Sequence, residues 1–264
     1  MHMKKIIFIA MATFGLAACD NIAQEDRLIY EAPPVVNRSV LIEDFTGQRC
    51  INCPNASDEI HSLQQEYGED AVIAVGIHGG PMALFPNPER GIVGLATDVG
   101  NSYNEYWKVE QWPMGMVNRT GVCPYTDWKA KVRQELQKPA PVTLEVSVST
   151  AHSEIEADVR VISTNGTTNG NLQVWIVEDN ITAIQLMPDG TANREYVHQH
   201  VFRTAANGAW GESISIKEGA AYDTHISVPI ASTWQHENLS VVAFVYDDSG
   251  VLQVKRTAIG PSLQ

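Results

Sequence analysis

The feature that most constrains the fold is a change in hydrophobic period near residue 140. Before Pro139-Ala140-Pro141, short apolar runs alternate with helix-like stretches, and after it apolar and polar residues alternate one by one. A period near 3.6 indicates a helix, whereas a period of two indicates a half-buried strand. The sequence therefore predicts an α/β domain over residues 39–138 and an all-β domain over residues 142–264.

The first segment contains three apolar runs of strand length and three helix-like stretches. Pro54 directly follows Cys53, and a proline is tolerated in the first turn of a helix. The stiff Pro139-Ala140-Pro141 stretch cannot continue a helix and sets the boundary. We predict strands at 40–45, 71–77 and 114–117, and helices at 54–67, 95–107 and 128–136.

The second segment reads as about eight short strands without helices, separated by turn residues. Such a pattern is typical of an antiparallel sandwich, and we predict an immunoglobulin-like one. The expected strands are 142–148, 155–161, 172–177, 197–204, 213–217, 225–230, 239–246 and 252–256.

The N-terminus carries a targeting signal. Lys4 and Lys5 precede an apolar run that is too short to span a bilayer comfortably. The following Leu16-Ala17-Ala18-Cys19 resembles the lipobox of bacterial lipoproteins, which implies that residues 1–18 are removed and that Cys19 carries lipid. Residues 19–38 then form a polar tether. We expect membrane association through this anchor, on either the periplasmic or the surface face.

Charge and composition exclude several classes of protein. The chain has 264 residues, with 18 Lys+Arg against 31 Asp+Glu, and its formal net charge is −13. This charge repels phosphate backbones, so we expect no nucleic-acid partner. With 44% hydrophobic and 19% charged residues, the chain has enough apolar surface to fold.

The candidate chemistry lies in Cys50-Ile51-Asn52-Cys53, between a predicted strand and a predicted helix. A cysteine at a helix N-terminus has its thiolate stabilised by the helix dipole, and Arg49 adds a cation. The spacing allows the second cysteine to attack a mixed disulfide formed by the first. A structural disulfide is the alternative. A zinc site would need two more ligands, so we predict no metal and no cofactor.

Residues 44–54 resemble the active-site stretch of thioredoxin-like proteins. The resemblance implies that Cys50 exchanges with substrate, that Cys53 resolves the mixed disulfide, and that Asp44 assists proton transfer. Strand alternation puts Asp44 and its neighbour Glu43 on opposite faces and does not say which faces inward.

Trp112-Pro113 stands where that family has a cis-proline beside its peptide groove, so Pro113 and Trp112 are candidate substrate-binding residues. The bulky Trp112 departs from the small or β-branched residue that is usual before this proline. The tryptophan that usually precedes the first cysteine is also missing.

A narrower resemblance covers the whole chain. The lipobox, the stretch from Phe45-Thr46-Gly47 to Cys53-Pro54, Val117-Asn118-Arg119 and a C-terminal β domain together resemble the outer membrane protein twenty-eight family of bacterial lipoproteins. The resemblance implies an outer membrane location. The favoured function is thiol–disulfide exchange with envelope proteins that carry thiols or disulfides. The alternative is a non-catalytic surface lipoprotein that serves as a binding or structural module.

Three further parts of the sequence give weaker indications of function. We expect Cys123 to be a packed free thiol. His198-Gln199-His200 has the spacing of metal ligands on one strand face but lacks acidic or thiol partners nearby, so we predict an exposed polar face. His78 ends a predicted central strand and could touch a substrate there.

Overall fold

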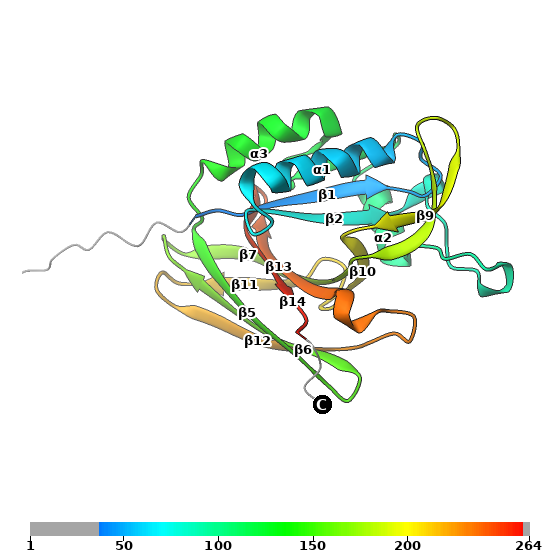
Figure 1. Cartoon of the computed structure of the whole chain (residues 1–264). Coiled ribbons are helices and arrows are strands. Elements are labelled where there is room, and N and C mark those ends of the chain that lie inside the picture. The colour runs from blue at the N-terminus through cyan, green and yellow to red at the C-terminus, as the bar shows by residue number, and fades with distance from the viewer. Residues whose placement is uncertain (1–36, 261–264) are drawn as a thin grey trace, which may run out of the picture. The chain divides into compact units, whose positions relative to one another are not determined.

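The computed structural model describes residues 37–260, which contain fourteen strands and three α-helices (Figure 1). The helices are α1 (Cys53–Tyr67), α2 (Asp98–Tyr106) and α3 (Trp128–Leu136). The strands are β1 (Val40–Thr46), β2 (Val72–His78), β3 (Met114–Val117), β4 (Val122–Pro124), β5 (Val142–Ala151), β6 (Glu154–Ser163), β7 (Thr168–Glu178), β8 (Ile181–Leu186), β9 (Ala192–His198), β10 (Val201–Ala205), β11 (Glu212–Ile216), β12 (Ala221–Pro229), β13 (Leu239–Asp247) and β14 (Gly250–Ala258).

Nine of these strands form one sheet that draws on both halves of the chain. Its order is β14-β13-β7-β10-β2-β1-β3-β4, with β11 paired to β7. The strands β1 and β2 are parallel because α1 makes the crossover between them. Three further strands form a sheet in the order β12-β6-β5, and β8 pairs with β9 in a two-stranded hairpin.

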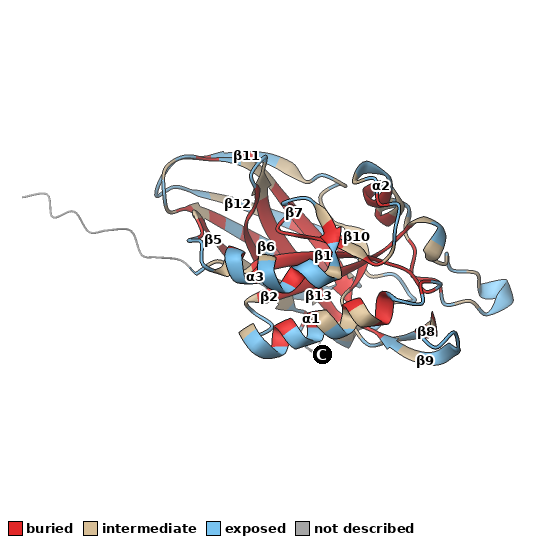
Figure 2. Ribbon diagram, turned by 90° about the horizontal axis from the view of Figure 1, so that it is seen from above, coloured by how far each residue is buried: buried red, intermediate tan, exposed pale blue. Residues whose placement is uncertain are grey.

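The helices α1 and α3 lie on the same side of β1 and β2 (Figure 1). Their apolar faces pack on side chains that alternate along β1, so that Val40 and Ile42 contact the cluster containing Leu63 and Trp128. Figure 2 shows the central strands buried and these helices exposed on their outer faces. This packing fixes the end of β1 from which the cysteine loop emerges.

Two larger hydrophobic cores hold most of the rest together. One lies between the three-stranded sheet and strands β7 and β13, and includes Val159 and Val174. The other joins residues far apart in sequence, such as Phe45, Trp175 and Phe244. None of the helices within residues 37–260 is long and apolar enough to cross a membrane.

The predicted fold class, a thioredoxin-like α/β domain followed by an immunoglobulin-like sandwich, is wrong. The described chain is mostly β, and the sheet containing β1 and β2 continues into the C-terminal half through β10. Val201 of β10 pairs with Gly76, whose N–H donates to the carbonyl of His200 at 2.7 Å. A hydrophobic period identifies a strand but not its partner, and here strands of the second half complete the sheet of the first. The limits 39–138 and 142–264 stay a prediction.

Most predicted elements are found close to their predicted ranges, but some differ. The helix predicted at 95–107 begins at Asp98, because the hydroxyl of Thr97 accepts from the N–H of Gly100 and caps it. The strand predicted at 197–204 is split into β9 and β10, with His200 at φ +57° between them. The strands β4 and β8 were not predicted at all.

Candidate functional site

Cys50 and Cys53 form a disulfide at the start of α1. Both residues are buried, with 4% and 2% of their surfaces exposed. Pro54 occupies the first turn of the helix, where the missing N–H costs nothing. The helix N-terminus therefore places the pair as the sequence predicts, but the sulfur atoms are shielded from solvent.

The cover over the disulfide is the β8–β9 hairpin. The side-chain amide of Gln185 donates to the carbonyl of Cys50 at 2.8 Å and to that of Gly47 at 3.4 Å. The N–H of Leu186 donates to the carbonyl of Gln48 at 2.9 Å. These bonds satisfy backbone acceptors of the cysteine loop that would otherwise be buried unpaired, and they hold the hairpin against the disulfide.

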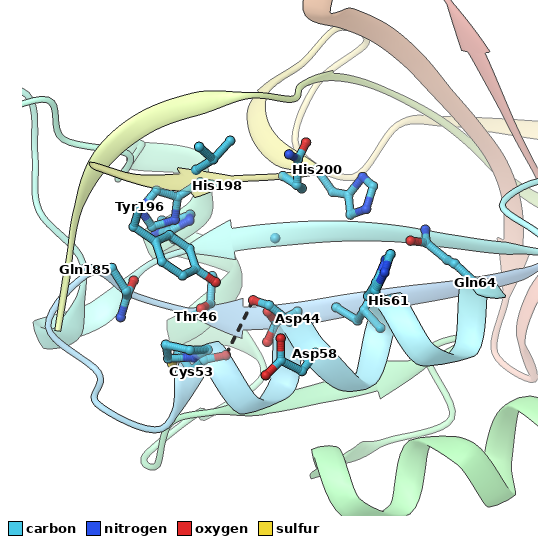
Figure 3. Close-up of a pocket in the computed structure, with 17 residues that line it drawn as sticks. Asp44, Thr46, Cys53, Asp58, His61, Gln64, Gln185, Tyr196, His198 and His200 are labelled. Carbon is cyan, nitrogen blue, oxygen red and sulfur yellow. Dashed lines mark hydrogen bonds between the residues drawn. The ribbon is translucent and has the colours of Figure 1, made fainter. Parts of the chain in front are cut away.

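A cavity of about 210 Å³ lies behind the disulfide, between α1, the ends of β1 and β2, and β9. Figure 3 shows Asp44, Cys53, Tyr196 and His198 around it. Asp44 comes from β1 and His198 from β9, so this site exists only because residues 154 positions apart in the sequence meet. This cavity is lined both by Asp44, a predicted catalytic residue, and by Cys53 of the disulfide.

Three buried polar atoms that line or border this cavity have no hydrogen-bond partner within the described residues: Oδ1 of Asp44, Nδ1 of His78 and Nε2 of His198. Burial raises the pKa of Asp44 to about 8. Burial also lowers the pKa of His78 well below its usual value, and lowers that of His198 to about 4 despite hydrogen bonds to the backbone. All three groups are therefore mostly uncharged at neutral pH.

The structure decides which acid faces the cavity. Asp44 does, whereas Glu43 points to the other side of β1 and pairs with Arg119, with Oε1 and Nη2 3.0 Å apart. The guanidinium of Arg119 also lies 4.3 Å from the ring centroid of Tyr246. Glu43 is thus part of a buried ion pair, and Asp44 is the carboxyl beside Cys53.

The predicted substrate-binding residues are not in the same cavity. The Trp112–Pro113 peptide bond is cis and leads into β3, which pairs with β1. Neither residue lines the cavity of Asp44 and Cys53. The indole of Trp112 instead covers Gly80, where an added Cβ would lie 2.6 Å from Cζ2. Their role in binding stays a prediction.

Sequence reasoning found one histidine of this site, His78, and misplaced the other, His198. The prediction of an exposed polar face at His198 is wrong, because His198 is buried with its ring centroid 5.3 Å from that of His78. The sequence signal for His78 was its position at the end of a predicted central strand, whereas nothing in the sequence indicated that His198 is buried. Cys123 is a buried free thiol, as predicted.

Two other predictions concern anchoring and metals. Cys19, the predicted lipidation site, and the signal segment 1–18 lie outside the described residues. Within residues 37–260, no group of three or more histidine, cysteine or acidic side chains is arranged to hold a metal ion.

Solved structures include a strong likeness of fold. HBP35 of Porphyromonas gingivalis is similar with a TM-score of 0.66 and 15% identity, covering 86% of this chain and 77% of that chain. A domain of the outer membrane lipoprotein Omp28 from Porphyromonas gingivalis is 24% identical, with a TM-score of 0.35, over 47% of this chain and 91% of that chain. No curated protein matches this chain.

Family membership comes from the sequence itself. The family model of outer membrane protein Omp28 matches residues 100–263, which is more than half of the chain. The match confirms the resemblance and the outer membrane location predicted from the sequence. The chain therefore belongs to the outer membrane protein Omp28 family.

Proposed function

We propose that this outer membrane protein is a non-catalytic binding or structural module in which Cys50–Cys53 is a static disulfide. The observation that carries the proposal is the burial of both cysteines beneath the β8–β9 hairpin. Thiol exchange needs a sulfur that a partner's thiolate or disulfide can reach. A disulfide that is shielded on both sulfurs serves instead to fix the loop between β1 and α1.

Thiol–disulfide exchange with envelope proteins is the second candidate. It is favoured by the carboxyl of Asp44, which shares a cavity with Cys53 and has its pKa raised to about 8. In this candidate, Cys50 exchanges with a partner, Cys53 resolves the mixed disulfide, and the ionised fraction of Asp44 takes up the proton that the Cys53 thiol loses. Pro113 and Trp112 would border the bound peptide.

The two candidates predict different redox behaviour. The full chain in detergent, carrying Cys123→Ser so that only one thiol pair can be labelled in the folded domain, is equilibrated in redox buffers and alkylated. A static disulfide stays oxidised down to about −300 mV. The variant Gln185→Ala, which frees the carbonyl of Cys50, is expected to be reduced faster, and Gln65→Ala on the exposed face of α1 is the matched control.

The contrary result is equally clear. A pair that is reduced reversibly between about −120 and −270 mV, at the same rate with and without Gln185→Ala, supports thiol exchange instead. The lipid anchor at Cys19 is tested separately by mass spectrometry of the mature N-terminal peptide, and a free thiol at Cys19 would contradict it.

A further inference from the structure

The β8–β9 hairpin has a second face, which borders an open groove. The groove has a volume of about 560 Å³ and lies between the hairpin and the loop that follows β2. Figure 1 shows this loop and the hairpin at the same end of β1 and β2. The volume falls in the range of about 300–1,000 Å³ that ligand sites commonly have. We call it the arginine groove, and its main side chains are Arg49, Arg90, Arg194, Ile92, Ile184 and Leu186.

The charge of the arginine groove is opposite to that of the protein. Arg49, Arg90 and Arg194 line it, and no aspartate or glutamate does. Five of the nine arginines within residues 37–260 form ion pairs, namely Arg38, Arg119, Arg160, Arg203 and Arg256. The three groove arginines form no ion pair with any residue between 37 and 260, and among the nine only Arg133 is like them in this respect. In a chain of net charge −13, three guanidinium groups in one groove without an acidic partner among the described residues complement an anion.

The groove combines this charge with apolar surface. Ile92, Ile184 and Leu186 are half-buried in it, and Val93 beside them is 51% exposed. Phe85, on the same loop, is also 51% exposed. Exposed apolar side chains of this size, next to cations that have no acidic partner in the described part of the chain, indicate a binding surface for an amphipathic anion.

The walls of the groove are fixed before any ligand arrives. The buried side chain of Gln48 donates to the carbonyls of Val93 at 2.9 Å and Ile184 at 3.2 Å, and accepts from the N–H of Leu95 at 3.1 Å. One glutamine thus connects the loop wall to the hairpin wall. Because the width is set in the free protein, less conformational entropy is lost on binding.

The distribution of charge distinguishes between kinds of anion. Arg90 stands on the loop wall, Arg194 on the hairpin wall and Arg49 beside Gln48 between them. A fatty acid carries its charge at one end and can pair with one wall. An extended peptide projects successive side chains in opposite directions, so its carboxylates can reach both walls while apolar residues contact the floor.

We propose that the arginine groove binds an acidic, partly apolar peptide segment of another envelope protein. Guanidinium groups pair with carboxylates through charge-assisted hydrogen bonds, which supply the affinity and fix the register. The proposal rests on the proposed function, because it names the partner of a binding module.

The test uses the full chain in detergent and a rhodamine-labelled peptide, Glu-Leu-Glu-Val-Glu, followed by fluorescence anisotropy. The expected result is binding that weakens with salt and is lost when glutamine replaces each glutamate of the peptide. Each of Arg49→Gln, Arg90→Gln and Arg194→Gln is expected to weaken binding about twofold to fivefold, as loss of an exposed ion pair does. Arg133→Gln, on the exposed side of α3, is the matched control and should bind as the wild type does.

Several outcomes overturn the proposal. The first is that the acidic peptide does not bind. The second is that the glutamine peptide binds as tightly as the acidic one. The third is that Arg133→Gln weakens binding as much as the three groove variants do. Binding of sodium decanoate without binding of the peptide would assign the groove to a lipid-like ligand. The redox measurement on Cys50–Cys53 is made with all three arginines in place, so failure of peptide binding leaves the static disulfide standing, and the reverse also holds.

Discussion

Asp44 is a carboxyl group buried in a cavity with no hydrogen-bond partner for Oδ1 among the described residues. An unfolded aspartate has a pKa of 3.8, whereas burial raises the pKa of Asp44 to about 8. The folded protein therefore holds a proton that the unfolded chain releases between these two pH values. Stability contributed by the neutral group is present below pH 3.8 and is lost as pH rises to about 8.

The loss of stability with rising pH gives a prediction for Asp44→Asn. The amide cannot ionise, so the variant escapes the loss of stability that the wild type suffers in this window. The free energy of unfolding of Asp44→Asn minus that of the wild type is expected to rise with pH between 4 and 8, with a limiting slope of about 1.4 kcal/mol per pH unit. Urea unfolding at several pH values measures it.

The control for that experiment is Asp58→Asn, which changes an exposed carboxyl at the mouth of the same cavity. It should follow the wild type at every pH. A difference between Asp44→Asn and the wild type that does not change with pH would show that Asp44 is not a buried neutral acid.

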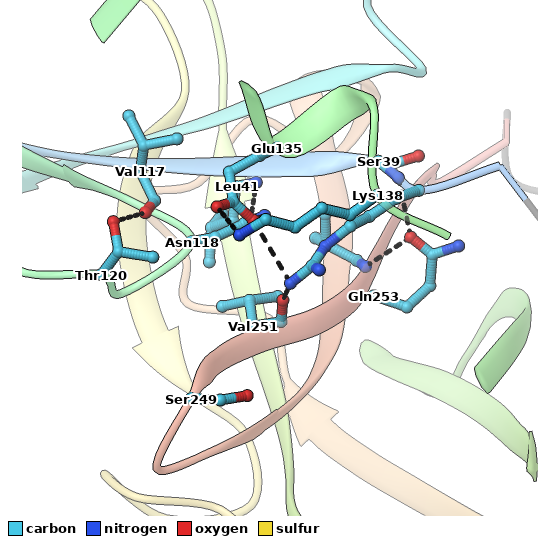
Figure 4. A network of polar contacts seen from close by, with 12 residues as sticks. Ser39, Leu41, Val117, Asn118, Thr120, Glu135, Lys138, Ser249, Val251 and Gln253 are labelled. Carbon is cyan, nitrogen blue, oxygen red and sulfur yellow. Dashed lines mark hydrogen bonds and ion pairs between the residues drawn. The ribbon is translucent and has the colours of Figure 1, made fainter. Parts of the chain in front are cut away.

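At the scale of secondary-structure elements, Asn118 connects β1, α3 and β14 (Figure 4). Its Oδ1 accepts from the N–H of Leu41 in β1 at 2.8 Å, and its Nδ2 donates to Oε2 of Glu135 in α3 at 3.1 Å. Its carbonyl accepts from the N–H of Val251 in β14 at 2.9 Å. The residue is fully buried, so these bonds cannot be replaced by water at the surface.

The variant Asn118→Gly isolates the side chain, because glycine tolerates the φ of +49° at this position. It leaves the N–H of Leu41 without its partner, and is expected to lower the free energy of unfolding by about 2–4 kcal/mol. Asn118→Ala should cost about 1 kcal/mol more because of its positive φ. Asn169→Ala, at an exposed strand position, is the control for loss of an amide. A cost for Asn118→Gly below about 0.5 kcal/mol, the range of surface changes, would contradict this assignment.

At the scale of the whole molecule, the first and second halves share one sheet and one core. β2 pairs with β10, and Phe45 and Ile73 contact the cluster that contains Trp175 and Phe244. The described residues, 37–260, all belong to a single compact unit. A fragment that lacks the second half would expose both an unpaired strand edge and an apolar face.

We therefore expect the full chain to unfold in urea as one transition, with tryptophan fluorescence and far-UV circular dichroism coinciding. A chain ending after residue 138 is expected not to fold. Two separated transitions, or a folded fragment 37–138, would show instead that the predicted domain limits, 39–138 and 142–264, describe independent units.

The sequence alone determined the features that depend on neighbouring residues. Apolar period and capping residues are local, so β1, α1, β3 and α3 lie within a residue or two of their predicted ranges. The placement of the cysteine pair at the start of α1 followed from the same signals. The family was also readable, because its motifs are short and contiguous.

Only the tertiary structure decided what depends on distant partners. Alternation along β1 is symmetric, so the choice of Asp44 over Glu43 required knowing which face α1 covers. The burial of His198 and the shielding of Cys50 both depend on the β8–β9 hairpin folding back over a loop about 135 residues earlier. Pairing of β2 with β10 likewise joined two segments that local periodicity separates. The reason is physical: local patterns set which backbone conformation is favoured, whereas burial and strand pairing are settled by contacts between residues far apart in the chain.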